Sequence, residues 1–368
     1  MDSFIHFSEE RFKFLRETYR KWWDGSLDRP IVPIITEGHP SRLDPSRYPA
    51  LSFATAWDES IAPELFVEQQ NAAFSTMRFH GDAFPAAAST PFGAGALAAL
   101  LGCKPISSRH TVWFLPNEKD IPIEELHFEY SEDTPAFRRI MRYYEAAVAK
   151  WQGSVVINMF DLGGVMDVLA SFRGTENLLM DLLDDPEEVL RCVREIQALW
   201  LRYFKRFTDV IAPTAPGYSH WYGMYSEKPS YILQSDFSYM ISPAMFDTFV
   251  APELASSAAQ MHNALYHLDG TGEIPHLDSI LKIDDIKGIQ WVPGDGEAFY
   301  KNWDELHLKI LNAGKKLISL TPSPDGTIDP LYTPYLRQLY FPFLRYRAEA
   351  LEQVKVFTGR YGVETTID

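Results

Sequence analysis

Short apolar runs alternate along the chain with longer stretches of helical periodicity. Eight strand-like runs end at loop signals, namely residues 31–36, 82–87, 155–160, 210–212, 237–241, 264–268, 289–292 and 317–320. Strands separated by helices pair in parallel and are buried on both faces, so this pattern predicts an α/β fold. Eight such strands favour a closed (β/α)8 TIM-type barrel over an open doubly wound sheet.

Capping residues mark several of the helices. Ser8 precedes an acidic first turn and starts the opening helix. Asp185 starts a helix that continues to about residue 207, and Ser242 starts another that continues to about residue 262. These helices fall between the predicted strands, as a barrel requires.

Two segments stand outside the repeating pattern. Residues 1–28 form an N-terminal helical extension, and residues 110–128, which are strand-like at 111–115, form a hairpin-like insertion. No internal repeat, low-complexity tract or long Gly/Ser linker divides the 368 residues. We therefore predict a single domain over residues 1–368, because one barrel of about 250 residues with insertions accounts for this length.

Composition and charge narrow the range of partners. With 46% hydrophobic and 23% charged residues, the chain has the composition of a globular protein with a large core. Its net charge of −16 repels nucleic acid and anionic membranes, so we expect neither as a partner. The most apolar stretch, residues 94–103, is too short to span a bilayer.

The N-terminus and the cysteines favour a cytoplasmic location. Residues 1–10 carry acidic side chains and lack the basic region of a signal peptide. Cys103 and Cys192 are far apart and lie in apolar helical surroundings. They fit core positions better than a disulfide framework, a thiolate zinc site or a nucleophile.

Polar residues follow the predicted strands, where a barrel places its active site. His39 and Arg42 come after the first strand, and Asp161 comes after the third. Asp236 precedes the fifth strand and can be a turn residue, a helix cap or a catalytic carboxylate. We assign His39 and Arg42 to substrate binding, and Asp161 and Asp236 to catalysis.

The densest chemical signal lies at the end of the sixth strand. Strand residues two apart face the same side, so His267 and Asp269 can meet one ligand. An imidazole and a carboxylate so placed can bind a metal, act as a base with its orienting partner, or hold a loop by a hydrogen bond. Glu273 is a further catalytic candidate, whereas Asp278 fits a helix cap better.

Aromatic side chains crowd the loop after the fourth strand. Tyr218, His220, Trp221 and Tyr222 can stack on a sugar or a flat conjugated ring while offering hydroxyl and imidazole groups. They can equally pack the loop onto the barrel. We assign these four, together with Trp291 at the end of the seventh strand, to substrate binding.

Four sequence blocks, read in order, carry a family resemblance. They are Asp161-Leu162-Gly163-Gly164 through Phe172-Arg173-Gly174, Asp184-Asp185-Pro186-Glu187, Ser235-Asp236-Phe237 to Ile241-Ser242-Pro243, and His267-Leu268-Asp269-Gly270. This series resembles the uroporphyrinogen decarboxylase superfamily, which includes zinc-dependent methyltransferases that serve corrinoid proteins. The resemblance implies a (β/α)8 barrel, methyl transfer or decarboxylation, zinc or another divalent metal, a corrinoid protein as partner and a homodimer.

The site residues differ from those of both well-known activities of that family. The decarboxylases follow their first strand with arginines that bind carboxylates, whereas here the stretch reads Thr36-Glu37-Gly38-His39-Pro40 with Arg42 nearby. The methyltransferases use His-x-Cys after the sixth strand and a cysteine after the eighth. Here His267-x-Asp269 and Asp325 stand at these places, so the resemblance implies a metal set with harder oxygen ligands.

Three functional hypotheses follow. The first is an enzyme that acts on a small organic substrate by metal-assisted or acid-base chemistry, of the methyl-transfer or decarboxylation type, in a pocket centred on His267 and Asp269. The second is a carbohydrate-active lyase or hydrolase in which two of Asp161, Asp236, Asp269 and Glu273 flank a glycosidic bond. The third is a catalytically inactive barrel that binds a ligand or a partner. No nucleotide, metalloprotease or serine-hydrolase motif adds a fourth.

Overall fold

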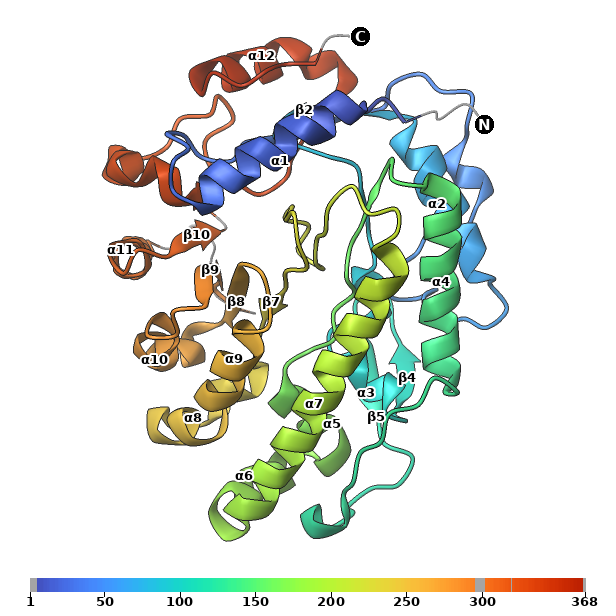
Figure 1. Ribbon diagram of the computed structural model, residues 1–368, viewed down its shortest axis with the longest axis vertical. Helices are drawn as coiled ribbons and strands as arrows, with labels where there is room; N and C mark the ends of the chain where they lie inside the picture. Colours follow the sequence, from blue (N-terminus) through green and yellow to red (C-terminus); the bar gives the residue numbers. More distant parts are fainter. Residues whose placement is uncertain (1–4, 295–301, 319, 367–368) are drawn as a thin grey trace.

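The computed structural model describes residues 5–294, 302–318 and 320–366. Figure 1 shows short strands in the interior, surrounded by helices of very different length. The helices are α1 (Glu9–Trp23), α2 (Pro63–Phe74), α3 (Leu97–Leu100), α4 (Pro135–Trp151), α5 (Val165–Arg173), α6 (Thr175–Asp184), α7 (Pro186–Ile211), α8 (Pro243–Phe249), α9 (Ala251–Ala258), α10 (Leu277–Leu281), α11 (Asp304–Asn312) and α12 (Leu351–Arg360). Together with the strands below they confirm the predicted α/β class.

The strands in the described part of the chain form four small sheets. The strands are β1 (Pro33–Glu37), β2 (Met77–Gly81), β3 (Ala86–Ala87), β4 (Lys104–Ser107), β5 (Val112–Leu115), β6 (Val156–Ile157), β7 (Ile232–Leu233), β8 (Ala264–Asp269), β9 (Ile286–Val292), β10 (Lys316–Ile318), β11 (Leu339–Tyr340) and β12 (Leu344–Arg347). Five of them pair in parallel in the order β11-β10-β9-β8-β7. A second sheet has the order β12-β1-β2, and β3 pairs in parallel with β6.

Backbone contacts connect these sheets into a longer series. A parallel bridge joins Ile31 to Tyr340 of β11, and another joins Asn158 to Ser219 after β6. The N–H of Asp82 donates to the carbonyl of Val32 at 2.9 Å. Among the described residues no backbone hydrogen bond joins the segment at Ser219 to β7, so the closed eight-stranded barrel stays a prediction.

Several sequence predictions are confirmed. Ser8 caps α1 by accepting from the N–H of Arg11, and α7 begins at Pro186. The strand-like stretch at 111–115 contains β5, which forms an antiparallel hairpin with β4, although β4 lies before the predicted insertion at 110–128. The predicted strand at 317–320 corresponds to β10, and its residue 319 lies outside the described residues. The first four residues of the predicted N-terminal extension lie outside them too.

Two predicted strands are wrong. Residues 210–211 belong to the last turn of α7 and Ala212 is its C-cap, and the buried face of this helix continues at helical spacing through Phe204, Phe207 and Ile211. Residues 237–240 belong instead to a 3₁₀ helix, Asp236–Met240, which Ile241 follows, and the strand in this region is β7. A short apolar run cannot distinguish a strand from a turn of buried helix, and here tertiary packing decides.

Two helix predictions also need correction. The helix expected from Ser242 breaks at Val250 into α8 and α9, because Pro252 has no N–H to continue the first helix. Asp278 does not cap α10, since it lies inside the first turn and its carboxylate binds Nζ of Lys309 at 2.7 Å. Its side chain is therefore part of a surface ion pair.

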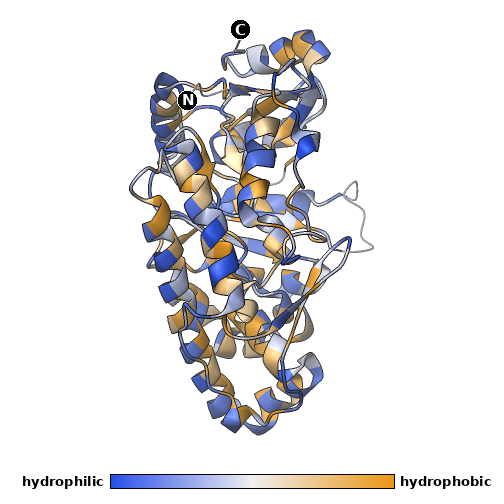
Figure 2. Cartoon of the chain, turned by 90° about the vertical axis from the view of Figure 1, so that its right-hand side faces the viewer, coloured by the Kyte–Doolittle hydropathy of each residue, from blue (hydrophilic) through white to orange (hydrophobic). Residues whose placement is uncertain are grey.

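Apolar faces of the long helices cover the strands. Figure 2 shows hydrophobic and hydrophilic segments alternating along these helices, as expected for elements with one buried and one exposed face. Buried aromatic rings such as Trp200, Tyr143 and Tyr144 fill the space behind them. In the described part of the chain, no helix combines the length and the apolar character needed to cross a membrane.

A buried ion pair anchors the first predicted strand to the second. The carboxylate of Asp82 accepts from both terminal nitrogens of Arg29, at 2.6 and 2.9 Å, and from the N–H of Val32 at 2.8 Å. The Asp82 side chain is completely excluded from solvent, so each of these bonds replaces a water that the carboxylate has lost.

We expect Asp82→Ala to lower the free energy of unfolding by about 3–5 kcal/mol, because Arg29 would then stay buried without its partner. The control is Asp133→Ala, which removes an exposed ion pair with Arg138 and should cost less than about 1 kcal/mol. Urea unfolding followed by circular dichroism measures both. Equal losses in the two variants would contradict the structural role of Asp82.

A buried carboxyl group lies between α7 and α9. Oε1 of Glu253 accepts from the hydroxyl of Ser257 at 2.7 Å, and its backbone carbonyl accepts from Nε2 of Gln197 at 3.1 Å. Burial raises the pKa of Glu253 to about 7. Since the unfolded chain ionises this group at lower pH, folding favours its protonated form.

This raised pKa predicts that Glu253→Gln increases the free energy of unfolding in a pH-dependent manner. The folded state binds the extra proton between the unfolded and folded pKa values, so the wild-type protein loses this stability as pH rises toward 7. The variant should therefore be more stable than wild type by on the order of 3 kcal/mol at pH 8 and about equal to it near pH 4. Urea unfolding across pH measures this difference, with Glu129→Gln as an exposed control.

Candidate functional site

The site begins with the register of two neighbouring strands. His267 and Asp269 lie two residues apart on β8 and so face the same side. Strand β9 places Gln290 directly opposite His267. Nδ1 of His267 lies 2.6 Å from Oε1 of Gln290. Because that oxygen can accept a hydrogen bond but not donate one, the proton of the neutral ring belongs on Nδ1 and Nε2 keeps its lone pair.

Asp236, at the start of the 3₁₀ helix after β7, contributes a third functional side chain. The carboxylate of Asp167, on α5, accepts from the N–H groups of Asp236 and Phe237 at 3.1 and 2.7 Å. This clamp holds the first turn of the 3₁₀ helix against α5. Gly164 makes it possible, because a Cβ there would lie 2.2 Å from the carbonyl oxygen of Gln234.

His267, Asp269 and Asp236 converge on one point. Each offers one ligand atom, and these atoms all lie within 4.8 Å of one another. Nε2 of His267 is 3.8 Å from Oδ2 of Asp269. One imidazole and two carboxylates from separate elements make a set of donors that suits a divalent metal ion.

Asp325, which was expected to complete the metal set, lies elsewhere. Its carboxylate is half exposed and binds Arg360 at 3.0 Å and the hydroxyl of Thr327 at 2.8 Å. Asp236 takes its place beside His267 and Asp269. The correction has a topological reason, since Asp167 pulls the 3₁₀ helix inward while the loop containing Asp325 packs toward α12.

Two further acids lie behind the cluster. Asp161 is buried and accepts from the N–H of Gly163 at 2.9 Å, while burial, opposed by this bond and by His267, raises its pKa to about 7. Glu273 is completely buried, and its Oε2 accepts from the hydroxyl of Tyr266 at 3.0 Å. Burial, together with the charge of Asp236, raises the pKa of Glu273 well above its usual range. Neither is among the three converging ligands.

The pKa values inside the cluster reflect the same crowding of acids. Burial lowers the pKa of His267, but the carboxylates of Asp269 and Asp236 outweigh this effect and the net shift is upward. Burial also raises the pKa of Asp167 to about 7, with a contribution from Asp236. Asp236 is exposed to solvent within a cleft, yet protein atoms surround it and its pKa is raised as well. A cation bound here would relieve this repulsion.

The structure separates the residues expected to bind substrate after the first strand. Nε2 of His39 lies 2.8 Å from the hydroxyl of Thr36, which also contacts Nε2 of His80 at 2.9 Å. Arg42 is exposed, and neither residue lines a cavity described below.

The four residues predicted to bind substrate in the loop at 218–222 lie in different surroundings. Trp221 and Tyr222 line a cavity, and the Trp221 ring lies edge-on to His267 with ring centres 5.2 Å apart. His220 is completely buried, and burial lowers its pKa to about 3, so it stays neutral. The backbone of Tyr218 pairs with Ser226 instead.

Trp291 lies on the opposite face of β9 from Gln290. It stands beside Leu268 in the strand register and packs edge-on against Trp303, with ring centres 5.0 Å apart. Because successive strand residues point to opposite faces, Trp291 cannot face the same side as His267. The ring therefore does not join the His267 cluster, and its role in substrate binding stays a prediction.

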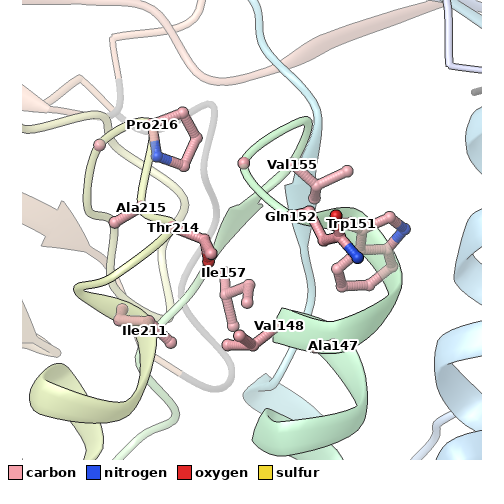
Figure 3. Close-up of a pocket in the computed structure, with 12 residues that line it drawn as sticks. Ala147, Val148, Trp151, Gln152, Val155, Ile157, Ile211, Thr214, Ala215 and Pro216 are labelled. Carbon is pink, nitrogen blue, oxygen red and sulfur yellow. The ribbon is translucent and has the colours of Figure 1, made fainter.

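Four hollows among the described residues differ sharply in size and lining, and one of about 800 Å³ between α2 and α4 includes no residue of the His267 cluster. A cleft of about 670 Å³ runs between the β4–β5 hairpin and α5 and includes Asp167 and Asp236. A cavity of about 340 Å³ includes Trp221 and Tyr222. The crevice in Figure 3, between the end of α4 and the loop after α7, measures about 10 Å³ and holds at most one water. The 670 Å³ cleft includes Asp236 of the cluster, the 340 Å³ cavity includes Trp221, whose ring contacts His267, and both are large enough for small molecules.

Sequence reasoning missed two positioning residues, Gln290 and Asp167. The available signal for Gln290 was a lone polar residue inside the apolar run at 289–292. Asp167 lies in the first turn of α5, where an acidic residue is ordinary, and its clamp on Asp236 involves chain about 70 residues away. No local pattern could reveal that contact.

The carboxylate spacing bears on the carbohydrate hypothesis. The ligand oxygens of Asp236 and Asp269 lie within 4.8 Å of each other. Retaining glycosidases separate their two carboxyl groups by about 5–5.5 Å and inverting enzymes by about 6.5–9.5 Å. The oxygens of this pair lie close enough to share a cation, and the carbohydrate hypothesis, which also named Asp161 and Glu273, stays a prediction.

Comparison with known proteins gives a structural likeness. No protein-family model matches the sequence, and no curated protein matches it significantly. Among solved structures, a methyltransferase from Methanosarcina mazei is similar, with a TM-score of 0.60 over 95% of this chain and 98% of its own. The two share 11% sequence identity, so the likeness establishes a common α/β fold.

The cluster predicts a change in the titration of His267. We expect Asp269→Asn to lower the pKa of His267, because the variant removes a negative charge that favours the imidazolium. Asp325→Asn should leave that pKa unchanged, since Asp325 binds Arg360 elsewhere. NMR titration of the metal-free protein measures both, and an unchanged His267 pKa in Asp269→Asn would refute the geometry of the cluster.

Proposed function

We propose that this protein is a metal-dependent enzyme that transfers a methyl group from a small organic substrate. The convergence of His267, Asp269 and Asp236 carries the proposal. Three protein ligands with a free side are typical of catalytic metal sites, whereas structural sites surround the ion completely. Here the exposed side of Asp236 faces the 670 Å³ cleft.

The donor set fits zinc or a similar divalent ion. Metal–ligand distances of about 2.0–2.2 Å place donor atoms about 3–4 Å apart, so small side-chain rotations would bring these three atoms into place. Gln290 orients the imidazole through Nδ1, which is the usual arrangement around metal-bound histidines. Asp167 orients Asp236 through its backbone rather than its side chain.

A divalent ion at this position would supply Lewis acidity to a heteroatom of the methyl donor. In the reaction, the bond between the methyl carbon and that heteroatom breaks, and the electron pair stays on the heteroatom. The acceptor contributes the pair for the new bond to carbon. Asp161, whose pKa is about 7, can hold a proton near neutral pH close to the cluster.

The family resemblance and the fold shared with a methyltransferase support methyl transfer over decarboxylation. The arginines that would bind a polycarboxylate substrate are missing after the first strand, where Arg42 is exposed to solvent. The resemblance further suggests a corrinoid protein as the acceptor and a homodimer as the assembly. Both extend the proposal and follow from the family rather than from the cluster itself.

Metal content tests the proposal directly. We expect wild-type protein to retain about one zinc or other divalent ion per chain after metal loading and dialysis, and His267→Ala to bind it at least about 100-fold more weakly. The loss follows because the imidazole is the one nitrogen ligand of the set. Elemental analysis and competition with a chromophoric chelator measure the two quantities.

His262→Ala is the matched control. His262 lies just before β8, is exposed and stands outside the cluster, so its removal should leave metal content unchanged. Circular dichroism establishes that both variants are folded. Absence of bound metal in folded wild-type protein, or equal binding by all three proteins, would exclude this site and favour an inactive or metal-independent barrel.

A further inference from the structure

The 340 Å³ cavity is lined in part by Trp221, whose ring also contacts His267 of the metal cluster. Aromatic and apolar side chains dominate its wall, and the rings among them are Phe74, Phe79, Phe84, Phe343, Trp221 and Tyr222. These rings come from α2, β2, the loop after β2, the aromatic loop and the segment before β12. A cavity of about 150 Å³ lined by apolar groups already accommodates benzene, so this one can hold a substituted or fused ring.

Two residues of the wall, Asn158 and Trp221, each have a buried side-chain polar atom, Oδ1 and Nε1, without a hydrogen bond in the described part of the chain. Asn158 is 5% exposed and lines the cavity, yet its Oδ1 is buried without a hydrogen bond in the described part of the chain. Its backbone is fully engaged, because its carbonyl accepts from Ser89 and Tyr144 while its N–H donates to Ala87. The side chain is thus held in place without being satisfied, as expected of a group that binds a ligand.

The cavity wall carries little net charge. Among the described residues that line it, the charged one is Arg345, and this residue forms an ion pair with Glu37. An anionic ligand would find no unpaired cation there, and a cationic ligand would find no carboxylate. Burial of either charge would therefore be unfavourable, and the chemistry favours a neutral molecule.

Trp221 connects the cavity to the cluster. Its indole lines the cavity and also meets the His267 ring edge-on, with an angle of 87° between the ring planes. The hydroxyl of Thr90 donates to the backbone carbonyl of Trp221 at 2.9 Å and fixes the loop. A molecule in the cavity would consequently lie one side chain away from a ligand of the metal.

We propose that this cavity is the substrate pocket and that it binds a neutral ring-containing molecule, one polar group of which pairs with the carboxamide of Asn158. That the cavity is the substrate pocket rests on the proposed function. That it binds a ligand rests on the cavity itself, on the unpaired Oδ1 of Asn158 and on the ion pair of Arg345. This substrate class is unlike a polycarboxylate or a charged thiol.

A simple probe tests the site in the full-length protein. The probe is 4-fluorobenzamide, because its amide can pair with Asn158 and its ring fits the aromatic wall. We expect saturable binding to metal-free wild type, about millimolar or tighter for a ligand of this size, by fluorine NMR. The anion 4-fluorobenzoate should bind at least about tenfold more weakly.

Two variants locate the bound probe. Asn158→Leu should weaken 4-fluorobenzamide about tenfold but leave fluorobenzene unchanged, because it removes the polar partner and keeps the volume. Ala73→Phe fills the cavity from α2 and should weaken both ligands. Ala149→Phe, exposed on α4 beside a different groove, is its matched control and should change neither.

Failure of binding and failure of the metal site are distinguishable. His267→Ala should bind the probe as wild type does, since the cavity does not depend on metal. In cobalt-loaded wild type the probe should shift the visible absorption spectrum, and it should not do so in Ala73→Phe. If cobalt does not bind, the proposed function fails while the apo titrations still decide the ring site.

Three outcomes would overturn the inference. They are absence of saturable probe binding to folded wild type, binding that survives Ala73→Phe unchanged, and binding in the cavity without any response of bound cobalt. The first two would remove the ligand site. The third would leave a ligand site that does not serve the cluster.

Discussion

The crowding of acids around a single imidazole is the constraint on which the site depends. Asp161, Asp167, Asp236 and Glu273 all have raised pKa values, and burial is the largest cause in each. Like charges in a poorly solvated space cannot all ionise without a compensating cation or proton. His267 supplies part of that compensation, and its own pKa rises in response. A divalent ion would supply the rest.

The surrounding structure holds these repelling groups together through backbone contacts. Asp167 binds two consecutive N–H groups of the 3₁₀ helix, and Gly164 allows α5 to approach the chain closely enough for this. The β8–β9 register does the same for His267 by placing Gln290 opposite it. Hydrogen bonds to charged acceptors are stronger than average, so the scaffold can oppose the repulsion at the cluster. The arrangement favours ligand binding at some expense of stability.

Sequence reasoning succeeded where local periodicity coincides with burial. It identified β8, the N-terminus of α7 and strand β5 of the hairpin because each carries its own signal. It failed at residues 210–212 and 237–241, where short apolar runs belong to helical turns. It assigned Trp291 to substrate binding, which stays a prediction, but it could not show that strand alternation turns this ring toward Trp303 and away from the face of His267.

The sequence alone determined the α/β class, the pairing of His267 with Asp269 on one face of a strand and the aromatic character of the loop around Trp221. These features depend on residues a few positions apart, for which backbone geometry leaves little choice. Tertiary structure alone decided that Asp236 rather than Asp325 joins the cluster, that Gln290 orients the imidazole and that Asn158 faces a cavity unpaired. Those contacts join segments that are distant in the chain, and their geometry is set by packing that no local pattern encodes.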